Sequence, residues 1–229
     1  MKDRLANNIE SVRGRIAEAC ARASRNYSDV TLVAVTKYIG SDIALLLPVA
    51  GVFDLGENRV QALVSKSAEV QSSVRWHMIG HLQRNKAKKA VQHSVLIHSV
   101  DSVRLIEALD ACGTVGNPVK ILLEVNVSGE GSKLGFDSDS VNSAVEFAMS
   151  CKCIELHGLM TMAPIVPDPG DTRPFFATLR NLHDSLKSKW RLPESFAHLS
   201  MGMSSDFEVA VEEGATLVRI GSLLYEGVL

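Results

Sequence analysis

Short apolar runs alternate along the chain with stretches in which apolar residues recur at helical spacing. The runs predict strands near residues 30–36, 52–55, 75–79, 95–99, 119–127, 154–161, 196–199 and 216–220. The other stretches predict a first helix over about residues 2–24 and further helices near 41–49, 58–70, 82–92, 102–112, 138–150, 172–188 and 205–213. Strands that alternate with helices in this way are typical of βα units and a parallel sheet.

Eight strands with helices between them fit a closed (β/α)8 barrel, a TIM barrel with an extra N-terminal helix. The main alternative is a doubly wound open sheet. Because α/β barrels of this length form one unit, we expect a single domain over residues 1–229. The chain ends soon after the eighth strand, so the last helix must be short, and we expect the N-terminal helix to cover part of the gap.

Composition and charge narrow the class of protein. Hydrophobic residues make up 46% of the chain and charged residues 22%, as in an ordinary globular protein with a large core. The net charge of −2 leaves no excess of lysine and arginine to neutralise a nucleic-acid backbone. No apolar segment reaches the length of a membrane span or forms a signal sequence, and the 4 cysteines have no metal-binding spacing. We therefore expect a cytoplasmic protein that binds no nucleic acid, membrane or metal.

Lys37 directly follows the apolar run 30–36, at the end of the first predicted strand. In a barrel the carboxyl ends of the strands gather on one rim, where active sites lie. A lysine held there among apolar walls is favoured as a neutral amine, which can form a Schiff base with a carbonyl. The alternative is a structural lysine whose stem packs on the strand end while its amine stays in water.

Two segments of small residues, 200–204 and 218–222, follow the seventh and eighth predicted strands. In many barrels the loops at these two places build a phosphate site, and backbone N–H groups with a helix N-terminus bind anions. The residues expected to converge there are Ser200, Gly202, Gly221 and Ser222. The structural alternative is that Ser204 or Ser205 caps the next helix and that Gly221 is sterically required at a helix start.

A cofactor with both an aldehyde for Lys37 and a phosphate for these segments is pyridoxal 5′-phosphate (PLP). Arg219 can only donate hydrogen bonds, so facing the pyridine nitrogen it would keep that nitrogen unprotonated. An ordinary ion pair between Arg219 and Glu213 is the alternative. Asn58, after the second predicted strand, either lies near the ring or caps the following helix.

Several segments together resemble the pyridoxal phosphate homeostasis proteins of the YggS type. They are Val35-Thr36-Lys37, Gly56-Glu57-Asn58, the run 76–86 (Trp-His-Met-Ile-Gly-His-Leu-Gln-Arg-Asn-Lys), the run 199–207 and Val218-Arg219-Ile220-Gly221-Ser222. The resemblance extends through nearly the whole chain, and the motifs are specific in their combination and order.

The resemblance implies a barrel like the N-terminal domain of alanine racemase, with PLP held on Lys37 as a Schiff base. The residues that it implies around the cofactor are Lys37, Asn58, Ser200, Met203, Arg219, Gly221 and Ser222. The phosphate would be held by Ser200, Gly221 and Ser222, with the backbone of Met203 nearby, and Arg219 would face the pyridine nitrogen. The family is thought to buffer or deliver PLP without an established reaction, so the implied partners are PLP and PLP-dependent apoenzymes. We expect a monomer.

A PLP-dependent amino-acid racemase of low activity is the second hypothesis. Racemisation needs acid–base groups on both faces of the substrate carbon. Alanine racemases take the second group, a tyrosine, from a β-rich domain that we expect this chain, which ends at Leu229, to lack. Tyr38 would point away from Lys37 if the strand continued through it. A phosphate-binding barrel without PLP is a third hypothesis, and we favour PLP binding without turnover.

Overall fold

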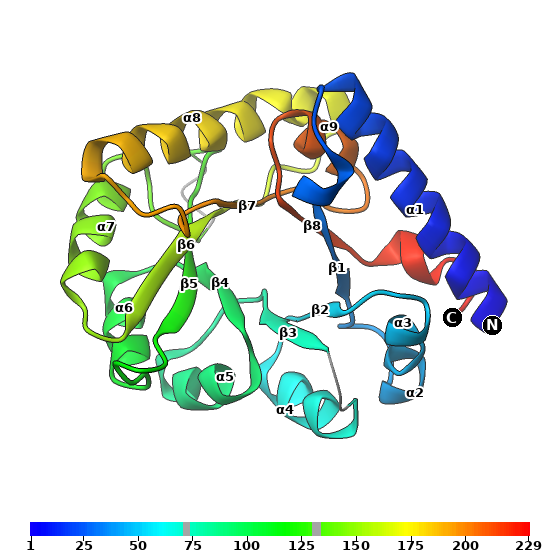
Figure 1. Cartoon of the computed structure of the whole chain (residues 1–229), viewed down its shortest axis with the longest axis horizontal. Helices are drawn as coiled ribbons and strands as arrows, with labels where there is room; N and C mark the ends of the chain where they lie inside the picture. Colours follow the sequence, from blue (N-terminus) through cyan, green and yellow to red (C-terminus); the bar gives the residue numbers. More distant parts are fainter. Residues whose placement is uncertain (71–73, 130–133) are drawn as a thin grey trace.

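The computed structural model describes residues 1–70, 74–129 and 134–229. Within these ranges, eight parallel strands form a closed barrel in which each strand pairs with the next and the last pairs with the first (Figure 1). The strands are β1 (Thr31–Val35), β2 (Asp54–Glu57), β3 (Arg75–Met78), β4 (Leu96–Val100), β5 (Val119–Glu124), β6 (Ile154–Met160), β7 (His198–Ser200) and β8 (Leu217–Ile220). The closed order confirms the predicted barrel and excludes the open sheet.

Helices surround the barrel on its outside (Figure 1). They are α1 (Lys2–Arg22), α2 (Ser41–Ala44), α3 (Leu46–Val49), α4 (Val60–Glu69), α5 (Ala87–His93), α6 (Val103–Asp110), α7 (Ser140–Ser150), α8 (Arg173–Trp190) and α9 (Phe207–Glu212). Short 3₁₀ turns add η1 (Tyr27–Asp29), η2 (Arg84–Lys86), η3 (Pro169–Thr172) and η4 (Ser222–Tyr225).

Several elements differ from their predicted bounds, among them two helices and one strand. The predicted helix over 41–49 consists of two short helices on either side of Leu45, because Pro48 lacks the N–H that would bond to the carbonyl of Ala44. The predicted helix over 82–92 begins only at Ala87, after η2. The second strand lies at 54–57 rather than 52–55, and the apolar residue Val52 is buried in the loop that precedes it.

Helix α1 lies along the side of the barrel next to α9 and η4 (Figure 1). Its buried stripe is formed by Leu5, Ile9, Val12 and Ile16, at the spacing of one helix face. Arg15 Nε lies 3.0 Å from Glu208 Oε1, and the side-chain amide of Asn8 donates to the carbonyl of Leu224 at 3.0 Å. Within the described residues β8 is followed by the turn η4, and α1 packs on that turn and on α9 at this side of the barrel.

The interior has two parts, which we call the shell and the lumen. The shell lies between the strands and the helices and is apolar; its fully buried side chains include Phe176, Leu55, Leu63 and Ile97. The lumen lies inside the ring of strands, where a small apolar cluster is formed by Val33, Leu96, Leu122, Met160 and Leu217.

Polar side chains share the lumen with that cluster. Asp54 and Arg219 are in register with Val33, and residues in register on parallel neighbours face the same side of a sheet. By the same argument His77 faces the lumen beside Leu96. The buried polar residues of the lumen therefore include Asp54, His77, His98, Ser200 and Arg219. Barrels more often fill this space with layers of branched apolar side chains.

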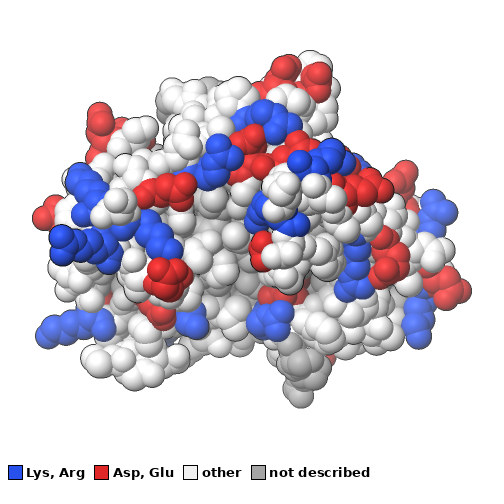
Figure 2. Space-filling model, turned by 45° about the horizontal axis from the view of Figure 1, so that its top comes forward, with Lys and Arg blue, Asp and Glu red and all other residues white. Residues whose placement is uncertain are grey.

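Charges of both signs are interspersed over the face of the molecule shown in Figure 2. That face presents no extended patch of one sign. Among the residues that can be described, no helix is both long enough and apolar enough to cross a membrane.

Candidate functional site

A pocket of about 490 Å³ opens at the carboxyl ends of the strands, next to β1 and β8. This volume lies in the range of small-molecule sites. Its wall is formed by Val35, Lys37, Tyr38, Asn58, Ile79, Met162, Ile165, Met203, Ser204, Ser205, Arg219, Gly221, Ser222 and Leu223. The pocket therefore lies on the rim where barrel proteins carry their sites.

Most of the site residues predicted from the sequence lie on this wall, namely Lys37, Asn58, Met203, Arg219, Gly221 and Ser222. Ser200 and Gly202 do not. The Ser200 side chain is fully buried, and its hydroxyl oxygen accepts a hydrogen bond from Arg219 at 2.6 Å. The structure thus places Ser200 against Arg219, and its contact with a phosphate stays a prediction.

Lys37 lies in the turn after β1, because the strand ends at Val35. Its side chain is exposed, so the prediction that apolar walls enclose it is wrong. The amine nitrogen lies 4.7 Å from the centre of the Tyr38 ring, in a cation–π contact. Tyr38 thus lies on the same side as Lys37. The expectation that it points away is also wrong, since it assumed a strand that continues.

A buried ion pair between Glu57 and Lys66 anchors this turn from behind. Lys66 Nζ donates to the carbonyl of Thr36 at 2.6 Å, and Thr36 Oγ1 donates to Glu57 Oε1 at 2.8 Å. All three residues are buried. These bonds fix the backbone one residue before Lys37, so its flexible side chain starts from a rigid point.

Asn58 brings an unused hydrogen-bond acceptor to the pocket. Its backbone N–H donates to Glu57 Oε2 at 3.0 Å, whereas its side-chain Oδ1 is buried and has no hydrogen-bond partner within the described protein. Arg59 is the residue at the start of α4, so Asn58 does not cap that helix. A Cβ at Gly80 would lie 2.4 Å from the carbonyl oxygen of Asn58, so only glycine lets the two loops approach. Asn58 is therefore held in place by packing, and a buried polar atom without a partner favours a ligand that supplies one.

The two small-residue segments meet at the pocket. The backbone N–H of Gly221 donates to Ser204 Oγ at 3.2 Å. The exposed residues Ser205 and Ser222 lie on the same wall. Hydroxyl and backbone donors from both segments therefore face one place, as an anion site requires. The sequence did not single out Ser204 or Ser205 as wall residues, and the structural alternative gave one of them to a helix cap.

That predicted cap is wrong, because α9 begins only at Phe207 with Asp206 at its cap position. The Asp206 carboxylate accepts from the backbone N–H of Met203 at 2.6 Å. The Met203 backbone, a predicted phosphate contact, thus already has a partner within the protein.

Gly202 and Gly221, one in each segment, differ in whether the protein itself requires glycine at that position. Gly202 has φ +92°, and a Cβ there would lie 2.6 Å from the Ala210 side chain, so the backbone itself requires glycine. A Cβ at Gly221 would meet only Val35, at an ordinary 3.4 Å. The predicted steric requirement at Gly221 is therefore absent, which leaves close approach of a ligand as a reason for glycine at the pocket wall.

Arg219 is almost completely buried between the pocket and the lumen. Besides its bond to Ser200, its Nη2 donates to the carbonyl of Thr161 at 2.9 Å. Burial lowers the pKa of Arg219 to about 10, so the guanidinium remains a cation at neutral pH. The alternative ion pair with Glu213 is wrong, since that carboxylate is bonded to two arginines of α8.

Glu124, at the end of β5, brings a second ionisable group to this part of the barrel. Burial raises its pKa to about 7 and the Asp101 carboxylate adds to the rise, whereas the Arg219 cation opposes it. Asp101 itself lies 3.0 Å from His81. Glu124 therefore holds or releases a proton near neutral pH.

Comparison with known proteins adds to this geometry. The family of the alanine racemase N-terminal domain matches residues 2–228. The pyridoxal phosphate homeostasis protein of Aquifex aeolicus is 38% identical over 225 residues, which cover 97% of this chain and 96% of that protein. The structure of PipY from Synechococcus elongatus with PLP bound is 34% identical, with a TM-score of 0.83, over 96% of this chain and 99% of that chain.

Alanine racemase itself is a more distant structural neighbour. The enzyme from Clostridium difficile aligns with a TM-score of 0.76 at 14% identity, over 97% of this chain and 56% of that chain. At this identity the likeness shows the barrel fold alone.

Proposed function

We propose a function on the premise that this chain belongs to the alanine racemase N-terminal domain family and, within it, to the pyridoxal phosphate homeostasis proteins. The chain binds PLP in the pocket next to β1 and β8 and acts in PLP homeostasis. The observation that carries this proposal is one pocket wall with an accessible amine, a buried guanidinium and a group of hydroxyl and backbone donors.

The residues present fit this cofactor. PLP has an aldehyde, an anionic phosphate and a ring with a polar nitrogen, and it supplies an electron-withdrawing aldehyde when it is bound. Lys37 matches the aldehyde and the serines of the two segments match the phosphate. The buried Oδ1 of Asn58, which has no hydrogen-bond partner within the described protein, provides an acceptor for a donor on the ligand.

Lys37 forms a Schiff base with the cofactor in this proposal. Its Nζ would hold the aldehyde carbon of PLP as a Schiff base, with the aldehyde oxygen released as water. The exposed side chain supports this role because the aldehyde can reach it from solvent. The buried Glu57–Lys66 pair holds the turn, so the amine returns to the same place after each release.

The other wall residues take binding roles. Ser204, Ser205, Gly221 and Ser222 bind the phosphate, and Arg219 faces the pyridine nitrogen as a permanent donor. An unprotonated ring is a weaker electron sink than a protonated one. This arrangement supports retention of the cofactor rather than chemistry on a bound amino acid.

We favour binding without turnover over the racemase alternative. Tyr38 is the tyrosine on the pocket wall, and its ring contacts the Lys37 amine. Two groups in contact with each other approach a substrate carbon from one side, whereas racemisation needs groups on both faces. The exposure of Tyr38 also leaves this part of the pocket open to water, which weakens stabilisation of a carbanion.

A homeostasis role follows from an open pocket and a reversible bond. Residues 1–229 act as one domain, a cytoplasmic monomer that takes up PLP and passes it to PLP-dependent apoenzymes. Transfer to an acceptor would free the Lys37 amine again, because water or an acceptor amine would take its place at the aldehyde carbon.

Absorption spectroscopy tests the proposal. Protein purified with PLP should show a visible absorption band, and Lys37→Ala should abolish it; the matched control Lys88→Ala, at an exposed lysine of α5 away from the pocket wall, should keep it. An unchanged band in Lys37→Ala removes Lys37 from its proposed role.

Racemase assays with a panel of amino acids decide the alternative. The proposal expects little turnover with any of them. Robust turnover that disappears in Lys37→Ala would establish an enzyme.

A further inference from the structure

Hydrogen-bonded side chains connect Arg219 to the opposite end of the barrel through the lumen. Arg219 Nη1 lies 2.6 Å from Ser200 Oγ, which lies 2.8 Å from His98 Nδ1. His98 Nε2 lies 2.9 Å from His77 Nδ1, and His77 Nε2 lies 3.0 Å from Asp54 Oδ1. We call these five residues the lumen chain. All five are buried, Ser200 and His98 completely.

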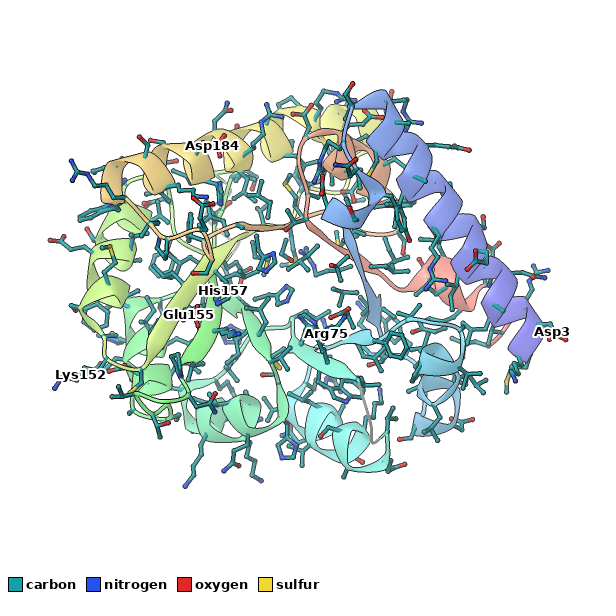
Figure 3. All side chains as sticks on the ribbon, in the orientation of Figure 1. Asp3, Arg75, Lys152, Glu155, His157 and Asp184 are labelled. Carbon is teal, nitrogen blue, oxygen red and sulfur yellow. The ribbon has the colours of Figure 1, made fainter. Side chains whose placement is uncertain are left out.

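The lumen chain runs along the length of the barrel. Arg219 lies near the carboxyl end of β8, beside the pocket. At the other end, Arg75 Nε donates to Asp54 Oδ1 at 2.8 Å. Arg75 is the first residue of β3, and Figure 3 labels it beside β2 and β3. The lumen chain therefore joins the cofactor pocket to the amino ends of the strands.

One arrangement of protons satisfies every group in the lumen chain. Arg219 can only donate, so Ser200 Oγ accepts from it and gives its own proton to His98 Nδ1. His98 then carries its proton on Nε2 and donates to His77 Nδ1. His77 donates from Nε2 to the Asp54 carboxylate. Both histidines are neutral, and each polar atom of the chain has a partner.

The electrostatics at both ends support this direction. Burial lowers the pKa of His98 well below its ordinary value, and the Arg219 cation adds to the effect, so His98 is neutral. Burial alone would raise the pKa of Asp54, but hydrogen bonds from His77 and Arg75 outweigh it and lower that pKa. Asp54 is therefore a carboxylate that accepts at one end, and Arg219 is a cation that donates at the other.

A merely space-filling lumen would not need these groups. Burying polar side chains costs free energy unless every one is paired. Apolar side chains of similar size commonly stabilise a fold equally well. What the chain does achieve is a fixed acceptor for one guanidinium nitrogen, while Thr161 fixes the other. A planar guanidinium held at both nitrogens cannot rotate.

We propose that Ser200, His98, His77 and Asp54 are positioning residues that hold the Arg219 guanidinium in one orientation at the pocket. This deepens the proposed function, because it names what sets the donor that faces the cofactor ring. It predicts that substitutions of His98 or His77, which do not line the pocket, change the affinity for PLP and the absorption spectrum of bound PLP.

Nitrogen-15 NMR of the imidazole rings tests the proton arrangement without any cofactor. The ligand-free protein at neutral pH should show His98 and His77 as neutral rings, both protonated on Nε2. A His98 ring protonated on Nδ1, or charged, overturns the proposed arrangement. Failure of PLP binding leaves this readout intact, so the two proposals fail separately.

Variants of the lumen chain test its effect on PLP binding. Ser200→Ala and His98→Leu should weaken PLP affinity by about 10-fold to 100-fold, the range for losing a hydrogen bond to a charged group, and should shift the absorption maximum of bound PLP. His98→Asn can still accept from Ser200 and should restore part of the affinity. The control His183→Leu removes another buried histidine, on α8 and bonded to the Phe196 carbonyl, and should leave affinity and spectrum unchanged.

Urea unfolding of each variant separates binding from folding. Wild-type affinity and spectrum in folded Ser200→Ala and His98→Leu overturn the positioning role. Equal losses in His183→Leu also overturn it, because the effect would then follow from any lost buried histidine. If Ser200→Ala does not fold, His98→Asn and the NMR measurement still decide.

Discussion

The shell and the lumen of this barrel are built from different chemistry. The shell is a continuous apolar layer in which side chains such as Phe176 and Leu63 are fully buried. The lumen holds a smaller apolar cluster together with the hydrogen-bonded chain that ends at Arg219. The shell contributes the apolar burial that stabilises the fold, whereas the lumen couples its polar groups to the pocket.

This difference separates two kinds of mutational effect. A shell residue should change the free energy of unfolding and leave the affinity of folded molecules for PLP intact. A lumen residue should change affinity or its pH dependence as well. The buried pair of Glu57 and Lys66, which holds the turn before Lys37, should affect both.

The largest effect on stability is expected from Phe176→Ala. This side chain of α8 is fully buried in the shell, and its loss leaves a cavity that costs about 4 kcal/mol. Urea unfolding measures the loss, and PLP titration at low urea measures affinity. An affinity loss comparable to that of Ser200→Ala would contradict the separation of shell and lumen.

Lys66→Met should cost roughly 3 kcal/mol, because it leaves the buried Glu57 carboxylate without its partner. It should also weaken PLP retention, since the turn before Lys37 loses the bond from Lys66 to Thr36. Urea unfolding and dialysis of the loaded protein measure the two losses.

The double variant Glu57→Gln/Lys66→Met is the control for this prediction, because it leaves no unpaired charge. It should recover a large part of the stability but not the retention of PLP. A double variant no more stable than Lys66→Met would show that the unpaired charge is not the cause.

Glu124→Gln should change how stability depends on pH. The pKa of Glu124 is about 7 in the folded protein against 4.5 ordinarily, so the folded state holds its proton more tightly than the unfolded state. Its contribution is full below pH 4.5 and is lost as pH rises through about 7, which amounts to at most about 3 kcal/mol. Relative to the variant, the wild type should therefore lose stability between pH 4 and pH 8.

Urea unfolding of both proteins across this range measures the difference. A difference in free energy that stays constant with pH, or that grows in favour of the wild type, would contradict the raised pKa.

Arg15→Ala should have the smallest effect, about 0.5 kcal/mol. The ion pair of Arg15 with Glu208 is partly exposed, and such pairs contribute little and are screened by salt. Urea unfolding at low and at high salt measures the contribution of this ion pair to the free energy of unfolding. A loss as large as that of Phe176→Ala would mean that α1 is held by charge rather than by its apolar stripe.

The fold could be predicted because it depends on patterns that repeat. All eight strands and the helix that begins at Lys2 follow from the alternation of apolar runs and helical spacing. The points at which the backbone leaves a helix or strand were harder to predict. Pro48 divides a predicted helix, and the first strand ends at Val35, which leaves Lys37 exposed in a turn.

The pocket residues could be predicted as a group, because strand ends in a barrel meet at one rim. Their individual contacts could not. Ser200 and Ser204 lie four residues apart in one segment, yet one is buried under Arg219 and the other lies on the pocket wall. The lumen chain could not be predicted either, since its members come from β2, β3, β4, β7 and β8 and only the register brings them together.

The central claim is that the Lys37 amine carries PLP. Reduction of the PLP-loaded protein with borohydride, followed by protease digestion and mass spectrometry of the peptides, locates the fixed cofactor directly. We expect the added mass on the peptide that contains Lys37 and not on one that contains Lys66. Added mass only on another lysine, or no added mass after loading, would contradict the account.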